Sequence, residues 1–392
     1  MTAMATSEKA PGSSLYIDRV LDLPSLLQRK SHFLFGPRQT GKTSLISHSL
    51  KGVRSYDLLD TSVFLALSQN PGRVSQELTR QDKLVVVDEI QRLPVLLNEI
   101  HRMIEERGIR FLLTGSSARK LRRDGVNLLG GRARTKYLHP LTYQELGNQF
   151  DLLKAINRGL LPSIYLSDDP RADLQAYTGS YLQQEIVAEG TTRNIPAFSR
   201  FLKVAALCNA TVVNFTNVAN DAQVPRTTVY EYFEILKDTL LLYELPAWRK
   251  SKKRKPLASS KYYFFDVGVV AALQGREFRR GTPEFGEAFE TYLMHELVSY
   301  SDYVSGEPLS YWRSTSGFEV DFILGDHTAI EVKAKENLST QDLKPLRAIA
   351  EEKKLKRYLC VSLEPRRRNL ENLTILPFRE FLESLWSRKY SP

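Results

Sequence analysis

A glycine-rich loop ending in a lysine and a hydroxyl residue is the part of this sequence best suited to chemistry on phosphates. In HFLFGPRQTGKTSLI, an apolar run at 32–35 leads through the spacing G-x-x-x-x-G-K-[ST] into a helical pattern. Glycines let backbone N–H groups converge on phosphate oxygens, and the following helix start adds positive potential. Lys42 would reach the outer phosphates, and the Thr43 hydroxyl would ligate Mg²⁺. These features predict an ATP site built from consecutive residues: Gly36, Pro37, Arg38, Gln39, Thr40, Gly41, Lys42, Thr43 and Ser44.

Two acids follow the next apolar run, LVVV at 84–87. A continuous apolar run is typical of a parallel strand covered on both faces, and Asp88 and Glu89 stand at its carboxyl end. Asp88 is expected to hold Mg²⁺ through water, and Glu89 to orient or deprotonate the attacking water. Together with the phosphate loop, the two acids indicate an ATPase that hydrolyses its nucleotide.

Three further polar residues are candidates for action on the γ-phosphate. The apolar run RFLLTGSS ends in Thr114 and Ser116, whose hydroxyls are placed as γ-phosphate sensors; capping of the following turn is the alternative. Arg132 precedes a strand near 137–138 and is a candidate finger toward a neighbouring subunit's nucleotide. An ordinary surface arginine is the alternative there.

A second group of chemically suited residues lies in EVDFILGDHTAIEVKAK, residues 319–335. Read as two strands around a turn at 325–326, the alternation separates an apolar face (Val320, Phe322, Leu324, then Ile330, Val332, Ala334) from a charged one. Asp321 and Glu331 would bind Mg²⁺ through hard oxygen ligands, and Lys333 would position or activate water. The preceding helical pattern offers Glu296 as a further contributor. A solvated strand face is the alternative.

These sites require several scaffolds. Strand and helix patterns alternate from about 30 to 147, which predicts an α/β sandwich with a parallel sheet over 15–147. A helical lid is expected over 148–195, a winged helix over 196–256 and a further α/β domain over 257–392. The polar segment 1–14 is expected to be disordered.

The middle of the chain predicts a helix-turn-helix. A short helix near 218–219 leads through 223–225 into a helix at 226–237 with Val229, Phe233 and Leu236 facing inward, and a strand follows at 240–245. The exposed helix start and the basic run WRKSKKRKP supply the candidate DNA contacts: Arg226, Thr227, Thr228, Tyr230, Lys252, Lys253 and Arg254. Winged helices also dock proteins or act as spacers, and a basic run is often a soluble linker.

Composition is consistent with a polyanion partner. The formal net charge is +10 and the pI is near 9.4. Only two cysteines occur, Cys208 and Cys360, far apart, which fits a reducing compartment and argues against zinc. No apolar run approaches the roughly 18 residues of a membrane span, and the polar start resembles no signal peptide. We therefore expect a cytoplasmic protein without a membrane partner.

The motifs resemble, in their order, the AAA+ superfamily, and specifically the bacterial and archaeal group of predicted AAA+ ATPases with a C-terminal domain of unknown function. The matching segments are GPRQTGKT, VVVDEIQ, LLTGSSARKL, GGRA…HPLTYQEL, GLLP at 159–162 and YWRSTSGFEVDFIL…IEVKAK. A helical acid, an Asp on one strand and Glu-x-Lys on the next also resemble the PD-(D/E)XK core of Holliday junction resolvases and restriction enzymes. The resemblance implies an AAA+ P-loop core with a parallel sheet, a winged helix-turn-helix and an α/β restriction-endonuclease-like domain.

The resulting hypothesis is an ATP-hydrolysing protein that processes DNA, with branched or junction DNA as substrate, ATP and Mg²⁺ as cofactors, and Mg²⁺-dependent cleavage left open. A homo-oligomeric, hexameric ring would let Arg132 act between subunits. The alternative is an ATP-dependent DNA-binding regulatory or scaffolding protein whose nuclease-like domain does not cleave.

Overall fold

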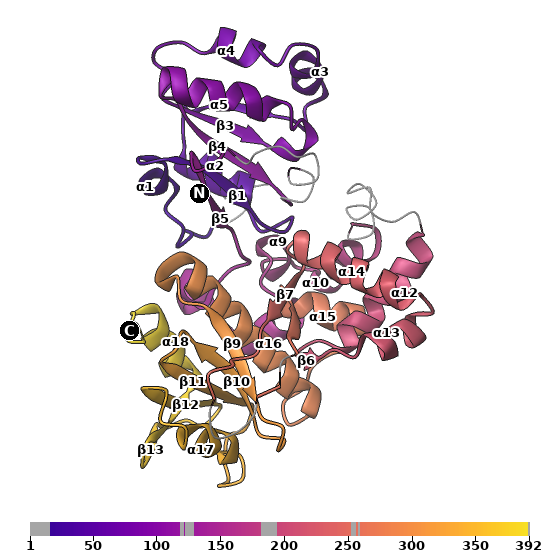
Figure 1. Cartoon of the computed structure of the whole chain (residues 1–392), viewed down its shortest axis with the longest axis vertical. Helices are drawn as coiled ribbons and strands as arrows, with labels where there is room; N and C mark the ends of the chain where they lie inside the picture. Colours follow the sequence, from indigo (N-terminus) through magenta and orange to yellow (C-terminus); the bar gives the residue numbers. More distant parts are fainter. Residues whose placement is uncertain are drawn as a thin grey trace, which may run out of the picture.

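The computed structural model describes residues 16–117, 121, 129–181, 194–251, 256–257 and 259–390. The expected disorder of residues 1–14 and the expected DNA contacts of Lys252, Lys253 and Arg254 lie outside these ranges. Within them, three sheets of five, three and six strands are arranged along the chain, as Figure 1 shows from indigo to yellow. No helix in these ranges has both the length and the apolar character needed to cross a bilayer.

The N-terminal sheet is parallel throughout and has the strand order β2-β3-β4-β1-β5. Its strands are β1 (Ser31–Phe35), β2 (Arg54–Asp57), β3 (Leu84–Asp88), β4 (Arg110–Gly115) and β5 (Ala133–Tyr137). Its helices are α1 (Leu23–Leu27), α2 (Lys42–Ser49), α3 (Thr61–Gln69), α4 (Arg73–Glu77), η1 (Ile90–Arg92) and α5 (Leu96–Arg107). The predicted parallel sheet is confirmed.

Both faces of this sheet are covered, which explains the continuous apolar runs. Phe33 and Phe35 pack in a core with α5, whereas Leu34 packs in a second core with α2. Strand β1 lies between β4 and β5, so the loop after β1 leaves the sheet at the same edge as the ends of β3 and β4. Ligand sites form at the carboxyl edge of such sheets.

A helical segment follows, with α7 (Tyr143–Leu146), η2 (Gly147–Gln149), α8 (Leu152–Arg158), α9 (Pro162–Tyr165), α10 (Pro170–Ala176) and η3 (Tyr177–Tyr181). The next module contains α12 (Ile195–Leu207), β6 (Thr211–Val212), α13 (Phe215–Ala222), α14 (Arg226–Asp238), β7 (Leu242–Leu245), β8 (Lys261–Phe264) and α15 (Val267–Gln274). The two helices expected at 218–219 and 226–237 are confirmed, and Val229, Phe233 and Leu236 are buried.

Strand β8 lies in the middle of an antiparallel three-stranded sheet, between β6 and β7. The boundary expected between residues 256 and 257 would separate β8 from this sheet, so the last module begins later than the sequence predicts. Side chains from α8, α12, α14 and α15 also share one apolar core with the C-terminal helices. The modules are therefore packed together rather than joined by a linker.

The C-terminal module begins with α16 (Pro283–Tyr300) and η4 (Ser301–Ser305). Its mixed sheet has the order β13-β14-β12-β11-β10-β9. The remaining elements are β9 (Leu309–Arg313), β10 (Glu319–Leu324), β11 (Thr328–Lys333), α17 (Lys344–Ala350), β12 (Arg357–Ser362), β13 (Arg368–Leu370), β14 (Leu373–Pro377) and α18 (Phe378–Trp386). Helix α16 packs in the core on one face of the sheet and α17 in the core on the other.

The hairpin of β10 and β11 forms as predicted, but the apolar face of its first strand does not. The register between β10 and β9 shifts between Val320 and Ile323. Phe322 and Leu324 pack in the core beside α16, whereas Val320 packs with Ile323 beside α17. The expected shared face of Val320, Phe322 and Leu324 is wrong, because an irregularity in the ladder interrupts strict alternation.

Candidate functional site

The phosphate loop surrounds a cavity of about 320 Å³ at the start of α2. Its lining residues are Arg38, Gln39, Gly41, Lys42, Thr43, Ser44, Leu59 and Glu89. Gly41 has a φ of 91°, a backbone conformation that favours glycine. At Gly36, a Cβ atom would stand 2.4 Å from the carbonyl oxygen of Leu138, so only glycine fits there. The loop therefore requires both glycines for its shape.

Lys42 is buried within this loop. Its Nζ donates hydrogen bonds to the carbonyl oxygens of Gly36 at 2.7 Å and Pro37 at 3.1 Å. The Thr40 hydroxyl donates to the same Pro37 carbonyl at 2.8 Å. The ammonium group is thus already inside the cradle that the sequence predicts for phosphates.

Asp88 lies between two hydroxyls from other elements. Thr43 Oγ1 donates to Asp88 Oδ2 at 3.3 Å, and Thr114 Oγ1 donates to Asp88 Oδ1. A carboxylate and a hydroxyl side by side are the hard oxygen donors that suit Mg²⁺, so these residues fit the implied cation. Thr114 contacts the acid itself, which makes it a positioning residue for Asp88.

Glu89 is held by a residue to which the sequence analysis assigned no role. Gln91 Nε2 donates to Glu89 Oε2 and also lies 3.3 Å from Ser116 Oγ. Gly115 leaves room for this side chain, since a Cβ there would stand 2.3 Å from Gln91 Oε1. Burial raises the pKa of Glu89, while the ammonium of Lys42 opposes the shift. Ser116 therefore contacts Glu89 only through Gln91. The position of Gln91 in the segment VVVDEIQ, two residues after Glu89, was the sequence feature that could have indicated its role.

Arg132 is engaged within its own chain. Its Nε pairs with Glu105 Oε1 and its Nη1 donates to the Gly130 carbonyl at 3.2 Å. The side chain is 36% exposed and precedes β5, the edge strand of the sheet. It is therefore placed at a surface rather than within the phosphate loop.

A buried arginine, also missed from the sequence, connects the phosphate loop to the rest of the molecule. Arg19 Nη1 donates to the Thr40 carbonyl and Nη2 to the His139 carbonyl, both at 2.6 Å. Arg19 Nε pairs with Glu145 Oε1 at 3.0 Å. His139 Nε2 in turn lies 2.6 Å from Asp302 Oδ2. The segment HPLTYQEL is therefore the bridge between the loop and the C-terminal module.

The candidate DNA contacts within the described ranges lie at the start of α14. Arg226 and Thr227 are exposed, Thr228 is half-buried, and Tyr230 is 41% exposed. Arg226 Nη2 donates to the Tyr230 hydroxyl at 2.9 Å, and the Tyr230 ring stacks on Phe215 with centroids 4.2 Å apart. This helix start presents a preorganised cation and aromatic ring to solvent.

Glu296 does not lie with the other candidate nuclease residues. Its carboxylate accepts hydrogen bonds from Tyr143 N at 2.7 Å, Trp386 Nε1 at 2.9 Å and the Tyr292 hydroxyl at 3.1 Å. Burial raises its pKa to about 7. The expectation for Glu296 is wrong: the helical acid near Asp321 is Glu290, and six positions separate them, about 240° around the helix.

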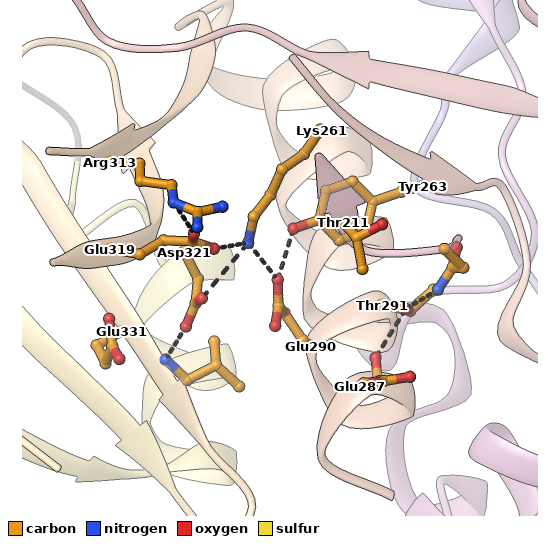
Figure 2. A network of polar contacts seen from close by, with 12 residues as sticks. Thr211, Lys261, Tyr263, Glu287, Glu290, Thr291, Arg313, Glu319, Asp321 and Glu331 are labelled. Atoms are coloured by element: carbon orange, nitrogen blue, oxygen red, sulfur yellow. Dashed lines mark hydrogen bonds and ion pairs between the residues drawn. The ribbon is translucent and has the colours of Figure 1, made fainter. Parts of the chain in front are cut away.

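Glu290 and Asp321 meet at a lysine that the sequence analysis did not consider. Lys261 Nζ lies 2.5 Å from Glu319 Oε1, 3.2 Å from Glu290 Oε1 and 3.8 Å from Asp321 Oδ1, as Figure 2 shows. Burial and the charge of Asp321 raise the pKa of Glu290 to about 7. We call Lys261, Glu290, Glu319, Asp321, Glu331 and Lys333 the acid cluster.

Glu331 and Lys333 occupy the neighbouring strand. Lys333 Nζ pairs with Glu331 Oε1 at 2.6 Å, as their shared strand face predicts. Burial raises the pKa of Glu331 well above its usual range, and Asp321 adds to the shift. In the described part of the chain, no group of three or more His, Cys, Asp or Glu side chains is arranged to hold a metal ion.

Comparisons with protein families divide the chain into three matches. Residues 28–147 match a family described as an AAA domain. Residues 149–280 and 285–381 match domains of unknown function, DUF8612 and DUF4143. The first match agrees with the parallel sheet and the phosphate loop. Residues 28–147 therefore form an AAA domain with the phosphate loop of an ATPase.

Two curated relatives are uncharacterized proteins. One, from Mycobacterium tuberculosis, is 25% identical over 328 residues, which cover 79% of this chain and 71% of the relative. The other, from Methanocaldococcus jannaschii, is 23% identical over 341 residues, covering 79% of this chain and 75% of the relative. Similarity therefore extends across most of the chain and beyond the AAA domain.

Solved structures with partial similarity include the Orc1 protein of Aeropyrum pernix in complex with DNA. It has a TM-score of 0.29 and 14% identity, with 67% of this chain and 93% of that chain covered. The replication initiator DnaA, bound to AMPPCP and single-stranded DNA, has a TM-score of 0.27 and 14% identity, with 55% and 85% covered.

Proposed function

We propose that this AAA-type ATPase uses ATP to act on DNA, with branched or junction DNA as its preferred substrate, by translocation or branch migration. The observation that carries the proposal is the path of hydrogen bonds and ion pairs that leads from the phosphate loop through Arg19 and His139 to the C-terminal half. One guanidinium bonds the Thr40 carbonyl of the loop and the His139 carbonyl of the bridging segment. A change in the shape of the loop would therefore displace Arg19, and with it the bridging segment that contains His139.

Hydrolysis follows from the arrangement around Asp88. Thr43 and Asp88 would hold Mg²⁺, which neutralises charge on the phosphates when bound. Glu89 orients or deprotonates the attacking water, and Gln91 fixes the direction of its carboxylate. Lys42 exchanges its loop carbonyls for phosphate oxygens.

A second path joins the end of β4 to the helix with the candidate DNA contacts. Ser117 Oγ donates to the Asp238 carbonyl at 3.1 Å, at the last residue of α14. Ser117 directly follows Ser116, which contacts Gln91. Movement of this strand end on hydrolysis would thus reach α14 directly.

Two groups of cations support a nucleic-acid partner. We interpret α12–β8 as a winged helix-turn-helix whose α14 presents Arg226 and Tyr230. A cavity of about 290 Å³ in the C-terminal module is lined by four basic side chains, Lys356, Arg357, Arg367 and Lys389, and by no acidic residue that the structure describes. Arg357 Nη1 is buried without a hydrogen-bond partner in the described ranges, which suits a phosphate oxygen.

Assembly into a hexameric ring is part of the proposal. Arg132 would leave Glu105 and stabilise the charge on a neighbour's transferring phosphoryl group. Its exposure beside the edge strand β5 supports this role.

A second candidate function is an ATP-dependent DNA-binding scaffold whose C-terminal module does not cleave. The position of Lys261 within the acid cluster favours it.

The test titrates single-stranded, duplex, forked and four-way DNA while ADP release and strand integrity are recorded. We expect four-way or forked DNA to stimulate ADP release several-fold more than duplex DNA. Equal ATP turnover with and without every DNA, combined with no retention of DNA at low salt, would contradict both candidates. Mg²⁺-dependent strand cleavage would exclude the second.

A further inference from the structure

The lysine at the acid cluster comes from a different module than the acids. Lys261 is the first residue of β8, which belongs to the three-stranded sheet of the preceding module. Its side chain is 3% exposed and points across to Glu290 of α16 and to Glu319 and Asp321 of β10, as the centre of Figure 2 shows. One ammonium group thus lies among three carboxylates.

Contacts of the segment that precedes Lys261 in the chain fix this position. Strand β9 pairs with the segment between β7 and β8: Trp248 N donates to Tyr311 O at 2.6 Å, and Leu257 N donates to Arg313 O at 2.9 Å. The Tyr311 hydroxyl donates to the Ser259 carbonyl at 2.5 Å. Lys261 therefore enters the cluster on a segment anchored to the module that carries the acids.

Three of the carboxylates have further protein partners besides Lys261. Asp321 Oδ2 accepts a hydrogen bond from Val332 N at 2.8 Å. Glu319 Oε2 lies 3.4 Å from Arg313 Nε, and the Tyr263 hydroxyl donates to Glu290 Oε1 at 2.6 Å. These contacts use the lone pairs that a cation would need.

Glu331 Oε2 is a buried oxygen without a partner in the described ranges. A single carboxylate oxygen is insufficient for Mg²⁺, which requires about six oxygen ligands in a near-octahedral arrangement. The orphaned atom therefore does not restore a metal site.

We infer that Lys261 takes the place of a divalent cation in the acid cluster. The C-terminal module therefore binds no metal ion at these acids and does not cleave phosphodiesters. The residues present do not fit the metal that the hairpin motif implies, because a fixed ammonium repels a second cation from the same carboxylates. The cluster instead joins two modules through charge. This inference concerns the metal alone and is independent of whether the chain binds DNA.

The experiment measures Mn²⁺ binding to nucleotide-free full-length protein by electron paramagnetic resonance. Asp88→Asn is included in every sample, so that the ATP site lacks the carboxylate that would hold a cation there. We expect no bound Mn²⁺ at 1:1 stoichiometry with Lys261 present, and at least about 10-fold tighter binding in Lys261→Met, because removal of one buried cation leaves the acids uncompensated. Adding Asp321→Asn to Lys261→Met should abolish that binding. Lys250→Met, at an exposed lysine paired with Asp326, is the matched control.

Stoichiometric Mn²⁺ binding with Lys261 intact that Asp321→Asn removes would overturn the inference, as would unchanged affinity in Lys261→Met. A second measurement requires no variant at Lys261: a four-way junction and a supercoiled plasmid should stay intact with the unaltered protein in Mg²⁺ or Mn²⁺. Strand cleavage that Asp321→Asn abolishes would also overturn it. The DNA-stimulated ATPase assay is separate, so its failure would affect only the proposed function.

Discussion

Gln91 Nε2 donates a hydrogen bond to Glu89 Oε2, and the same nitrogen lies 3.3 Å from Ser116 Oγ. Glu89, the candidate catalytic acid, is therefore oriented by a side chain two residues away, which itself contacts the residue after β4. Since Glu89 has a φ of 59° at the end of β3, the turn directs its side chain toward the phosphate loop cavity that it lines.

Removing this contact should slow hydrolysis without weakening ATP binding. We expect Gln91→Leu to lower kcat by about 10-fold with little change in KM, because a positioned general base contributes roughly 10²- to 10⁴-fold. Steady-state ATPase kinetics check this. Gln81→Leu, at an exposed glutamine, is the control. A raised KM at unchanged kcat would place Gln91 in nucleotide binding instead.

Arg132 should act between subunits. Homogeneous Arg132→Ala and Glu89→Gln proteins should each be nearly inactive, since an arginine finger contributes about 10³- to 10⁵-fold. In an equal mixture, about one site in four would combine an intact Glu89 with a neighbour's intact arginine. ATPase activity near a quarter of the unaltered level is expected after subunit exchange. No recovery would favour the ion pair with Glu105 as the residue's whole role.

The buried carboxyl of Glu296 should make stability depend on pH. Burial raises its pKa from 4.5 to about 7. The stabilisation that this carboxyl gives the folded state is thus fully present below pH 4.5 and is lost as pH rises through about 7. The corresponding change in the free energy of unfolding is of order 3 kcal/mol. We expect the free energy of unfolding to decline less steeply from pH 5 to pH 7.5 in Glu296→Gln than in the unaltered protein. Denaturant unfolding measures it, with exposed Glu371→Gln as control; parallel curves would refute the assignment.

Arg19 should matter for stability more than a surface ion pair does. Its pair with Glu145 is buried, with side chains 3% and 0% exposed. We expect Arg19→Met to lower the free energy of unfolding by about 3 to 5 kcal/mol, because it leaves Glu145 as an uncompensated buried charge. Arg73→Met, which removes an exposed pair with Glu77, should cost under about 1 kcal/mol. Similar losses from both changes would argue against the bridging role.

The start of α14 should contact DNA phosphates. Arg226→Ala is expected to weaken DNA binding about 5- to 10-fold and to reduce the salt-dependence slope by about one. Fluorescence anisotropy at several salt concentrations measures both. Arg279→Ala, at an arginine 78% exposed elsewhere, is the control. Equal effects of the two substitutions would indicate only a response to net charge.

The phosphate loop could be predicted because all of its parts are local. Glycine spacing, Lys42 and Thr43 lie within one strand-loop-helix segment, so eight consecutive residues carry the geometry. Asp88 and Glu89 were predictable for a related reason, since a buried parallel strand ends where ligands bind. Arg19 and Gln91 were not, because nothing in their local sequence indicates which distant carbonyl or carboxylate they meet.

The acid cluster shows more clearly what could not be predicted from the sequence. Strand alternation placed Glu331 and Lys333 together correctly, but a register shift reversed the face of Val320, and helix rotation brought Glu290 rather than Glu296 to Asp321.

The sequence by itself determined the AAA core, its phosphate loop and the hairpin, because periodicity and turn chemistry act over a few residues. Only the tertiary structure decided that Lys261 meets the acids, since β8 and β10 are brought together by long-range packing. An ammonium and a carboxylate 60 residues apart have no local signature. The distance in space between the Lys261 ammonium and the carboxylates sets the strength of their electrostatic interaction. That interaction decides whether the acids pair with a lysine or are available to a metal ion.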